Sequence, residues 1–289
     1  MAKRQQVNNQ QPISINIDPN IFNHAYIPHF MSKEEFKYNV FYGGSGSGKS
    51  NYIAHYLIID LLKNKKRLLV IRQTLATIRE SVFNELVNVI KRMNLDTHKD
   101  TKITHSTMRI GLPNGSEIIF RGADEESKLL SISDIDTVWI EEASEISYDI
   151  FTQIKLRLRG KGHKKRIFIS FNPISASHWL KAEFFDNQVD DCYVLKTTYL
   201  DNRFLDAEYH KVMLDLKERN FDKYRIYSLG EWGVTGKQVF SKWKAVEFDV
   251  HDLIKSNPNL KTAIGGDFGY SLDPSTMICS LVEWTEYPA

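Results

Sequence analysis

The sequence contains Gly43-Gly44-Ser45-Gly46-Ser47-Gly48-Lys49-Ser50, a run that matches the pattern G-x-x-x-x-G-K-[ST]. Glycines let such a loop bend tightly and bring backbone N–H groups close to phosphate oxygens. Residues 39–42 before the run predict a strand, and residues 50–62 after it predict a helix, which is the context that the pattern requires. We therefore predict a phosphate-binding loop, with Lys49 at the β- and γ-phosphates and Ser50 as a ligand of Mg²⁺.

Two adjacent carboxylates, Glu141 and Glu142, follow a second apolar run at residues 137–140. Adjacent residues at a strand end point in different directions, so one can face a metal ion while the other faces the terminal phosphate. We assign Glu141 to the magnesium site and Glu142 to activation of the attacking water. Glutamate is also favoured at helix N-termini for electrostatic reasons alone, and this is the competing interpretation.

A third apolar run, residues 167–171, ends in the polar residues Ser170 and Asn172. In P-loop motors, a polar residue at the end of the next strand along the chain can sense the terminal phosphate of a bound nucleotide. The alternative is that Asn172-Pro173 only begins a turn.

The remaining pattern predicts an α/β fold. Residues 67–71 predict a buried strand, residues 77–93 a helix, and residues 108–112 with 117–121 a hairpin. Alternation of strands and helices implies a mainly parallel sheet covered by helices on both faces.

Composition narrows the class of protein without identifying a partner. The 289 residues are 42% hydrophobic and 26% charged, as in ordinary globular domains. The two cysteines, Cys192 and Cys279, argue against a disulfide scaffold or a cysteine-rich zinc site. No apolar run is long enough for a membrane span, and the first residues lack the apolar core of a signal peptide.

Charge is distributed locally rather than globally. The net charge is only +2, which does not predict a nucleic-acid-binding protein. Basic residues cluster at 63–67 and at 157–166, and each cluster fits either a binding surface or a solvated turn.

The chain is predicted to have four parts. Residues 1–20 form a flexible tail, and residues 21–236 form the phosphate-loop domain. Residues 237–260 are a linker with a short strand, and residues 261–289 begin a new unit with a strand from Thr262.

Together and in this order, the three motifs resemble the large terminase subunit of tailed bacteriophages, from about Val40 to about Pro274. Residues 71–74 and 77–81 resemble the segment of that family that follows the loop helix, and residues 139–143 its acidic motif. Residues 170–173 are similar to its coupling motif, so the resemblance makes Ser170 and Asn172 coupling residues. Residues 197–202 and 229–232 resemble the segments that close its ATPase domain.

The resemblance implies an ASCE-type P-loop NTPase that hydrolyses ATP with Mg²⁺. It implies a motor that moves double-stranded DNA into a procapsid in the host cytoplasm, through contacts to the DNA backbone. The expected partners are a terminase small subunit and a portal, with no membrane. The chain is expected in a homo-oligomeric ring when assembled, with a monomer in isolation as the alternative. Tyr26 and Ile27, upstream of the loop, are candidates for contacts to the base.

Residues 265–270, followed by Asp273-Pro274, resemble the first strand of the family's nuclease domain. That domain has a ribonuclease-H-like fold, and Asp267 matches the first of its metal-binding carboxylates. Because Asp267 alone cannot hold two metal ions, the segment is interpreted as incomplete and no endonuclease activity is expected. The alternative is that Asp267 caps a turn among glycines.

The loop departs from the family pattern at Ser45, where many terminases carry a basic residue. Another cation is then needed at the transferred phosphate. Arg79, Arg157 and Arg159 are candidates for an arginine finger in cis or from a neighbouring subunit, and each also fits an ordinary surface arginine.

Two other functions share part of this pattern. A nucleotide-dependent interaction module would bind ATP as a switch but has no need of Glu142. A helicase or recombination ATPase would share the loop and the acidic pair but would not lead into residues 265–274.

Overall fold

The computed structural model describes residues 17–124, 132–159, 162–233, 249–257, 259–267 and 276–283. The chain divides into two compact units, and the division falls between Lys237 and Gln238. The predicted domain boundary after residue 236 is adjacent to this division, although both positions lie outside the described residues.

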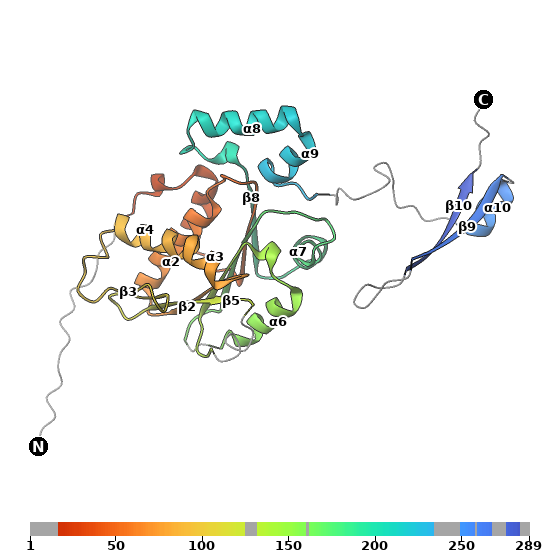
Figure 1. Cartoon of the computed structure of the whole chain (residues 1–289). Helices are drawn as coiled ribbons and strands as arrows, with labels where there is room; N and C mark the ends of the chain where they lie inside the picture. The colour runs from red at the N-terminus through yellow and green to blue at the C-terminus, as the bar shows by residue number, and fades with distance from the viewer. Residues whose placement is uncertain are drawn as a thin grey trace, which may run out of the picture. The chain divides into compact units, whose positions relative to one another are not determined.

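The first unit is built on an eight-stranded sheet with the order β3-β4-β5-β2-β6-β7-β1-β8 (Figure 1). All pairings from β5 to β8 are parallel, whereas β3 and β4 are antiparallel at one edge. The strands are β1 (Tyr38–Gly43), β2 (Arg67–Arg72), β3 (Lys102–Thr104), β4 (Arg109–Gly111), β5 (Glu117–Gly122), β6 (Thr137–Glu141), β7 (Arg166–Phe171) and β8 (Cys192–Thr197).

Helices cover both faces of this sheet, as predicted from the sequence. Because successive strand residues point to opposite faces, Leu68 and Val70 of β2 join one core, and Leu69 and Ile71 join the other. The longer helices are α2 (Lys49–Lys63), α3 (Leu75–Glu80), α4 (Val82–Arg92), α6 (Tyr148–Arg157) and α8 (Ala207–Arg219).

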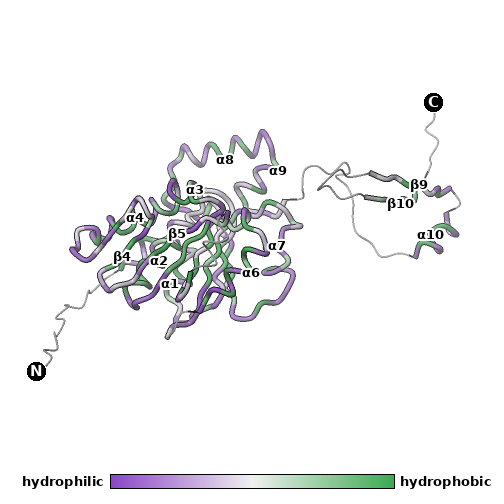
Figure 2. The backbone as a smooth tube through the Cα atoms, turned by 60° about the horizontal axis from the view of Figure 1, so that its bottom comes forward, coloured by the Kyte–Doolittle hydropathy of each residue, from purple (hydrophilic) through white to green (hydrophobic). Residues whose placement is uncertain are grey.

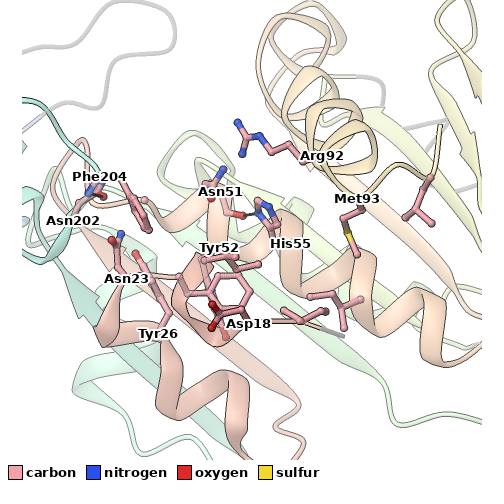
Figure 3. Close-up of a pocket in the computed structure, with 16 residues that line it drawn as sticks. Asp18, Asn23, Tyr26, Asn51, Tyr52, His55, Arg92, Met93, Asn202 and Phe204 are labelled. Carbon is pink, nitrogen blue, oxygen red and sulfur yellow. Dashed lines mark hydrogen bonds between the residues drawn. The ribbon is translucent and has the colours of Figure 1, made fainter. Parts of the chain in front are cut away.

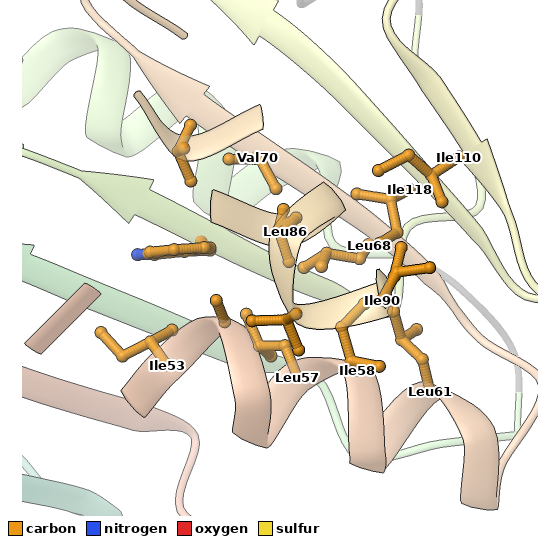
Figure 4. Packing of buried hydrophobic residues seen from close by; sticks show 14 of the residues in the cluster. Ile53, Leu57, Ile58, Leu61, Leu68, Val70, Leu86, Ile90, Ile110 and Ile118 are labelled. Atoms are coloured by element: carbon orange, nitrogen blue, oxygen red, sulfur yellow. The ribbon is translucent and has the colours of Figure 1, made fainter. Parts of the chain in front are cut away.

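The first core lies between β2, β5 and the helices α2 and α4 (Figure 4). Leu57 and Ile58 of α2 and Leu86 and Ile90 of α4 are almost fully buried there. The buried residues of α4 recur at helical spacing and form one stripe, so α4 presents a single face to the core. The helix α2 is instead buried around most of its surface, because almost every residue from Tyr52 to Leu61 is buried.

The second core lies on the other face, where Phe151 and Ile154 of α6 pack against the strands. The short helix α7 (Trp179–Lys181) contributes Leu180 to the same cluster. A smaller cluster joins α8 to the segment that ends the first unit, through Tyr199, Met213 and Tyr224. In Figure 2, α8 alternates between hydrophilic and hydrophobic colours, as expected for a helix with one side exposed.

The helix predicted over residues 77–93 is wrong in one respect, because it is broken at Ser81 into α3 and α4. Ser81 has φ −116° and ψ −93°, and its hydroxyl donates to the carbonyl of Thr77 at 2.6 Å. The same hydroxyl accepts from Arg72 Nη1 at 2.8 Å. A serine that bonds its own backbone competes with the helical ladder, and the tertiary bond from Arg72 fixes the break.

The second unit holds α10 (Val250–Ser256) and an antiparallel pair, β9 (Leu260–Asp267) and β10 (Thr276–Glu283). The strand predicted from Thr262 is confirmed as part of β9. The described part of the segment predicted as a linker, from residue 249 on, contains α10, whose first turn is capped by the side chain of Asp249. Residues 237–248 of that segment lie outside the described residues. Gly269, Tyr270, Asp273 and Pro274 lie outside the described residues.

The two basic clusters come together at the amino edge of the sheet, where β2 and β7 begin. Half of the ten lysines and arginines in these clusters have a carboxylate partner, so a structural role accounts for those five. The pairs are Lys66–Asp60 at 3.0 Å, Arg67–Glu117 at 3.1 Å, Lys164–Asp191 at 2.9 Å, Lys165–Asp136 at 2.9 Å and Arg166–Asp60 at 3.6 Å. In the part of the chain that the structure describes, no helix is long and apolar enough to cross a bilayer.

A buried histidine joins α1 (Ile27–Met31) to the sheet. His29 Nε2 lies 2.9 Å from Asn39 Oδ1, and His29 Nδ1 lies 2.6 Å from the hydroxyl of Tyr52. The amide nitrogen of Asn39 donates to the carbonyl of Phe36, so its oxygen faces His29 and Nε2 carries the proton. The ring is therefore neutral, and Nδ1 accepts from Tyr52.

This arrangement makes the stability of the first unit depend on pH. Burial lowers the pKa of His29 from 6.5 to about 4. The unfolded chain therefore binds a proton that the folded chain excludes, and stability falls as the pH drops from about 6.5 to about 4. Between about pH 7 and about pH 5, we expect the free energy of unfolding to fall by about 2 kcal/mol more in the wild-type chain than in His29→Gln. Urea unfolding of both proteins at the two pH values measures this difference. Equal losses in the two proteins would contradict the assignment.

Candidate functional site

The phosphate loop connects β1 to α2 at the carboxyl edge of the sheet, as predicted. Gly46 and Gly48 have φ values of 73° and 84°, a region that residues with a Cβ rarely adopt. A Cβ at Gly46 would also lie 2.6 Å from the ring of Tyr209 on α8. These two positions therefore require glycine, both for conformation and for space.

Strand order brings the three predicted motifs together at this loop. β7 lies between β1, which leads into the loop, and β6, which ends in the acidic pair. Parallel strands end at the same edge, so Ser170 and Asn172 come between the loop and the carboxylates. Together they line a cavity of about 240 Å³ formed by Ser45, Gly46, Ser47, Gly48, Lys49, Ser50, Glu141, Glu142, Ser170, Phe171 and Asn172.

Lys49 is the cation of this cavity. Its ammonium group donates to Asn172 Oδ1 at 2.9 Å and to the carbonyls of Gly44 at 2.9 Å and Gly43 at 3.2 Å. Burial lowers its pKa to about 8, although the carboxylates of Glu142 and Glu141 oppose this shift. Lys49 therefore keeps its proton at neutral pH, and its positive charge is held inside the loop.

Glu141 is fixed by two hydroxyl groups. Ser50 Oγ donates to Glu141 Oε1 at 2.5 Å, and Ser170 Oγ donates to Oε2. The indole nitrogen of Trp139 in turn donates to Ser170 Oγ at 2.9 Å. The side chains of Ser50 and Glu141 are thus already adjacent, at the edge of the cavity, in the places predicted for magnesium ligands.

Hard oxygen ligands of this kind fit Mg²⁺, which commonly takes one or two protein oxygens together with phosphate oxygens and water. Among the described residues, no group of three or more His, Cys, Asp or Glu side chains could hold a metal ion by itself.

Glu142 occupies a strained position beside this pair. Its φ and ψ of 51° and 54° are left-handed, so its side chain leaves the strand in a different direction from that of Glu141. Burial, and then the charge of Glu141, raise its pKa to about 7, against the opposing charges of Lys49 and Arg72. A carboxylate near this pKa can both accept and release a proton at neutral pH, as a general base must.

Comparison with known proteins agrees with this geometry. The sequence profile described as "Phage terminase large subunit" matches residues 35–231. This chain belongs to the phage terminase large subunit family. It is 33% identical over 271 residues to the PBSX phage terminase large subunit of Bacillus subtilis (strain 168), covering 84% of this chain and 61% of the relative. It is 30% identical over 273 residues to the large terminase subunit of Bacillus phage SPP1, covering 88% and 64%.

This terminase-family chain thus spans less than two thirds of the length of the curated relatives that it matches. Among solved structures, it resembles the large terminase of a thermophilic bacteriophage with a TM-score of 0.65 and 16% identity. That likeness covers 89% of this chain and 64% of the other. At this identity it shows the fold, which is that of a P-loop NTPase-type terminase.

The predicted finger arginines do not line the cavity of their own chain. Arg79 is exposed on α3. Arg157 and Arg159 lie at and beyond the end of α6, which runs from the carboxyl edge back to the amino edge, where β7 begins. An arginine finger from any of the three therefore stays a prediction.

Arg72 is the site residue that the sequence did not single out. It ends β2, whose Ile71 pairs with Ile140 of β6, so Arg72 lies beside the acidic turn. Its Nε lies 3.5 Å from Glu145 Oε2, and its charge opposes the raised pKa of Glu142. This position depends on β2 lying beside β6, a strand order that the sequence does not reveal.

A second cavity of about 950 Å³ adjoins the outer side of the loop (Figure 3). Figure 3 shows Asn23, Tyr26, Asn202 and Phe204 at one end of it and Arg92 and Met93 at the other. Tyr26, a predicted candidate for base contacts, lines this cavity, whereas Ile27 does not.

Asp267 is the last residue of β9, in the second unit. It therefore belongs to a separate compact unit from the phosphate loop. Its predicted role as a nuclease metal ligand stays a prediction.

Proposed function

We propose that this chain hydrolyses ATP with Mg²⁺ and thereby drives double-stranded DNA into a viral procapsid. One observation carries the proposal: Lys49, the Ser50–Glu141 pair and Glu142 meet in a single cavity at the end of the parallel sheet. Binding of a phosphate chain requires the first two features. Glu142 has no role in binding alone, and its presence beside them favours hydrolysis over a passive nucleotide switch.

The residues act in a defined order in this proposal. Backbone N–H groups of the loop and the ammonium of Lys49 bind the phosphates, and Lys49 exchanges some of its present acceptors for phosphate oxygens. Glu142 orients a water molecule in line with the terminal phosphate and accepts its proton. A magnesium ion held by Ser50 and Glu141 neutralises charge on the phosphate oxygens when it is bound.

The link from hydrolysis to movement runs through β7. Asn172 Oδ1 accepts from Lys49, and Asn172 Nδ2 donates to Ser45 Oγ at 3.3 Å. Loss of the terminal phosphate changes the partners of Lys49, so Asn172 and the end of β7 respond to the reaction. Ser170 is tied in the same way to Glu141. This supports the proposal that Ser170 and Asn172 are coupling residues.

Family membership supports a proposal for the larger assembly. Residues 21–236 are proposed as the ATPase domain, and residues 261–289 as the start of a nuclease domain. The motor works in the host cytoplasm as a ring of copies, with a terminase small subunit and a portal as partners. Its contacts are to the DNA backbone, so binding is expected to weaken steeply with salt and to be independent of sequence.

Replacing Lys49 with Ala tests the site directly. We expect the rate of ATP hydrolysis, with or without double-stranded DNA, to fall by about 10²- to 10³-fold, because the variant loses the buried cation at the phosphates. Lys63→Ala, at the exposed end of the same helix, is the control and should keep the wild-type rate. Phosphate release measured across a range of protein concentrations decides the matter. Bound ATP without turnover in the wild-type chain at every concentration would favour the switch instead.

A further inference from the structure

Side chains from two distant segments form hydrogen bonds to the outer side of the phosphate loop. The hydroxyl of Tyr26, from the turn before α1, donates to the carbonyl of Ser47 at 3.0 Å. Asn202 Nδ2, from the segment after β8, donates to the carbonyl of Gly46 at 2.6 Å. Asn23 Nδ2 lies 3.5 Å from the Ser47 carbonyl as well. Both consecutive loop carbonyls are therefore held from outside the phosphate cavity.

Because each peptide unit is planar, the direction of a carbonyl group fixes the direction of the N–H group that follows it. The peptide bonds of the described residues, the loop included, are all trans, and in a trans peptide the C=O of one residue and the N–H of the next point in opposite directions. With the Gly46 carbonyl held outward, the N–H of Ser47 points inward. With the Ser47 carbonyl held outward, so does the N–H of Gly48. Both residues line the 240 Å³ cavity, where a phosphate would accept from these N–H groups.

Tyr26 is itself rigidly placed. Its side chain is fully buried and stacks on Tyr52, with ring centroids 4.4 Å apart. Its oxygen also lies 2.9 Å from Thr197 Oγ1 at the end of β8. Burial raises its pKa to about 12, so the hydroxyl stays protonated and remains a donor to the loop.

Asn202 is oriented by a second hydrogen bond. Its Oδ1 accepts from the backbone N–H of Phe204 at 3.1 Å, so the amide nitrogen must face Gly46. The neighbouring Arg203 ties the same segment to the N-terminal part of the chain, because its N–H donates to Asn23 Oδ1 at 3.1 Å. The segment before α1 and the segment after β8 are thus hydrogen-bonded to each other as well as to the loop.

We propose that Tyr26 and Asn202 are positioning residues that keep the loop in its phosphate-binding form before a nucleotide arrives. The inference rests on the proposed ATP site and adds to it the groups that fix its donors. Without them, the two peptide planes are free to rotate, and ordering the loop then weakens binding. The residues act on the phosphate chain through the backbone and not on the base.

The test compares Tyr26→Phe and Asn202→Ala with two matched controls. Tyr56→Phe removes a partly buried hydroxyl from the same aromatic layer, and Asn114→Ala removes an amide that donates to a carbonyl of Leu61 at 2.6 Å. Neither Tyr56 nor Asn114 lines the phosphate cavity. The probes are ADP and inorganic pyrophosphate, each with Mg²⁺, titrated calorimetrically. We expect the Kd for both probes to rise about tenfold in the two test variants and to stay unchanged in the controls.

The pattern of losses separates the possible causes. An equal loss for ADP and pyrophosphate, with kcat at saturating ATP within about twofold of wild type, supports positioning of the loop. Loss for ADP alone would assign both residues to the base and overturn the inference, as would unchanged affinities in both variants. If the wild-type chain bound neither probe, the proposed ATP site itself would be wrong. If Tyr26→Phe failed to fold, the partly exposed Asn202 would still decide the question.

Discussion

The Glu142→Gln variant is expected to bind ATP nearly as well as the wild-type chain and to hydrolyse it about 10²- to 10⁴-fold more slowly. Glutamine keeps the size and shape of the side chain but cannot accept the proton of the attacking water. Its neutral amide also removes one of the two adjacent negative charges in the cavity, which are repelled by a nucleotide. The loss should therefore appear in kcat and not in the Kd for ATP.

The matched control is Glu145→Gln, three residues along the same turn. Glu145 pairs with Arg72 and does not line the 240 Å³ cavity. Its replacement should change kcat by no more than about threefold, since it only perturbs the charge around Glu142. Single-turnover hydrolysis and equilibrium binding of ATP, measured on both variants, give the two constants. A Glu142→Gln chain that turned over at the wild-type rate would show that another group activates the water.

The local parts of this site could be predicted because each depends on a short stretch of chain. The glycines of residues 43–48, the adjacent Glu141 and Glu142, and Ser170 with Asn172 all follow apolar runs. An apolar run that stops at polar residues marks a strand end, and parallel strands end at one edge. Their place at the ends of strands therefore has a physical basis, and Gly46, Gly48, both glutamates, Ser170 and Asn172 line the 240 Å³ cavity. Their roles in catalysis stay predictions.

The order of the strands could not be predicted in the same way. Periodicity indicates which residues form a strand, but not which strand lies beside it. The position of β7 between β1 and β6 decides that Asn172 contacts Lys49. The edge strands β3 and β8 were missed, since β8 is only half buried and lacks the continuous apolar pattern of a central strand.

Contacts between distant segments could not be predicted from the sequence either, because they also depend on which segments lie side by side in the fold. Tyr26 and Asn202 meet the loop only because the N-terminal segment and the end of β8 fold against it. Arg72 gains its role from the neighbouring strand, and Ser81 breaks a helix because Arg72 reaches it. In each case the residue type is common, and the tertiary position alone gives it a function.

The largest expected loss of stability comes from Asp60→Ala, at the amino edge of the sheet. Both oxygens of Asp60 lie 3.0 Å from the ammonium of Lys66, and Asp60 Oδ1 lies 3.6 Å from Arg166 Nη1. The exposed fraction is 4% for Lys66 and 1% for Arg166. Removing the carboxylate leaves two buried cations without their closest anion, and we expect a cost of about 3–5 kcal/mol.

Asp186→Ala is the surface control, because Asp186 pairs with Lys181 where both side chains are accessible to water. Its cost should not exceed about 1 kcal/mol. Urea unfolding of the two variants beside the wild-type chain measures both values. A loss for Asp60→Ala as small as that of the control would mean that water reaches the Lys66 ammonium when its partner is removed.

The salt dependence of the stability loss shows whether the charges around Asp60 are buried or only close together. Mobile ions weaken the interaction between exposed charges that lie farther apart than the Debye length, which is about 10 Å at about 0.1 M salt and about 3 Å at about 1 M. They do not enter a packed interior, so buried pairs are screened much less. Arg166 stacks over the rings of Tyr56 and Phe168, with its carbon 5.2 Å and 4.9 Å from their centroids, and these rings exclude water from its charge. The cost of Asp60→Ala should therefore persist at about 1 M salt, whereas that of Asp186→Ala should vanish. A cost for Asp60→Ala that disappeared with added salt would place Lys66 and Arg166 in contact with solvent, and the ion pairs of the amino edge would then contribute little to stability.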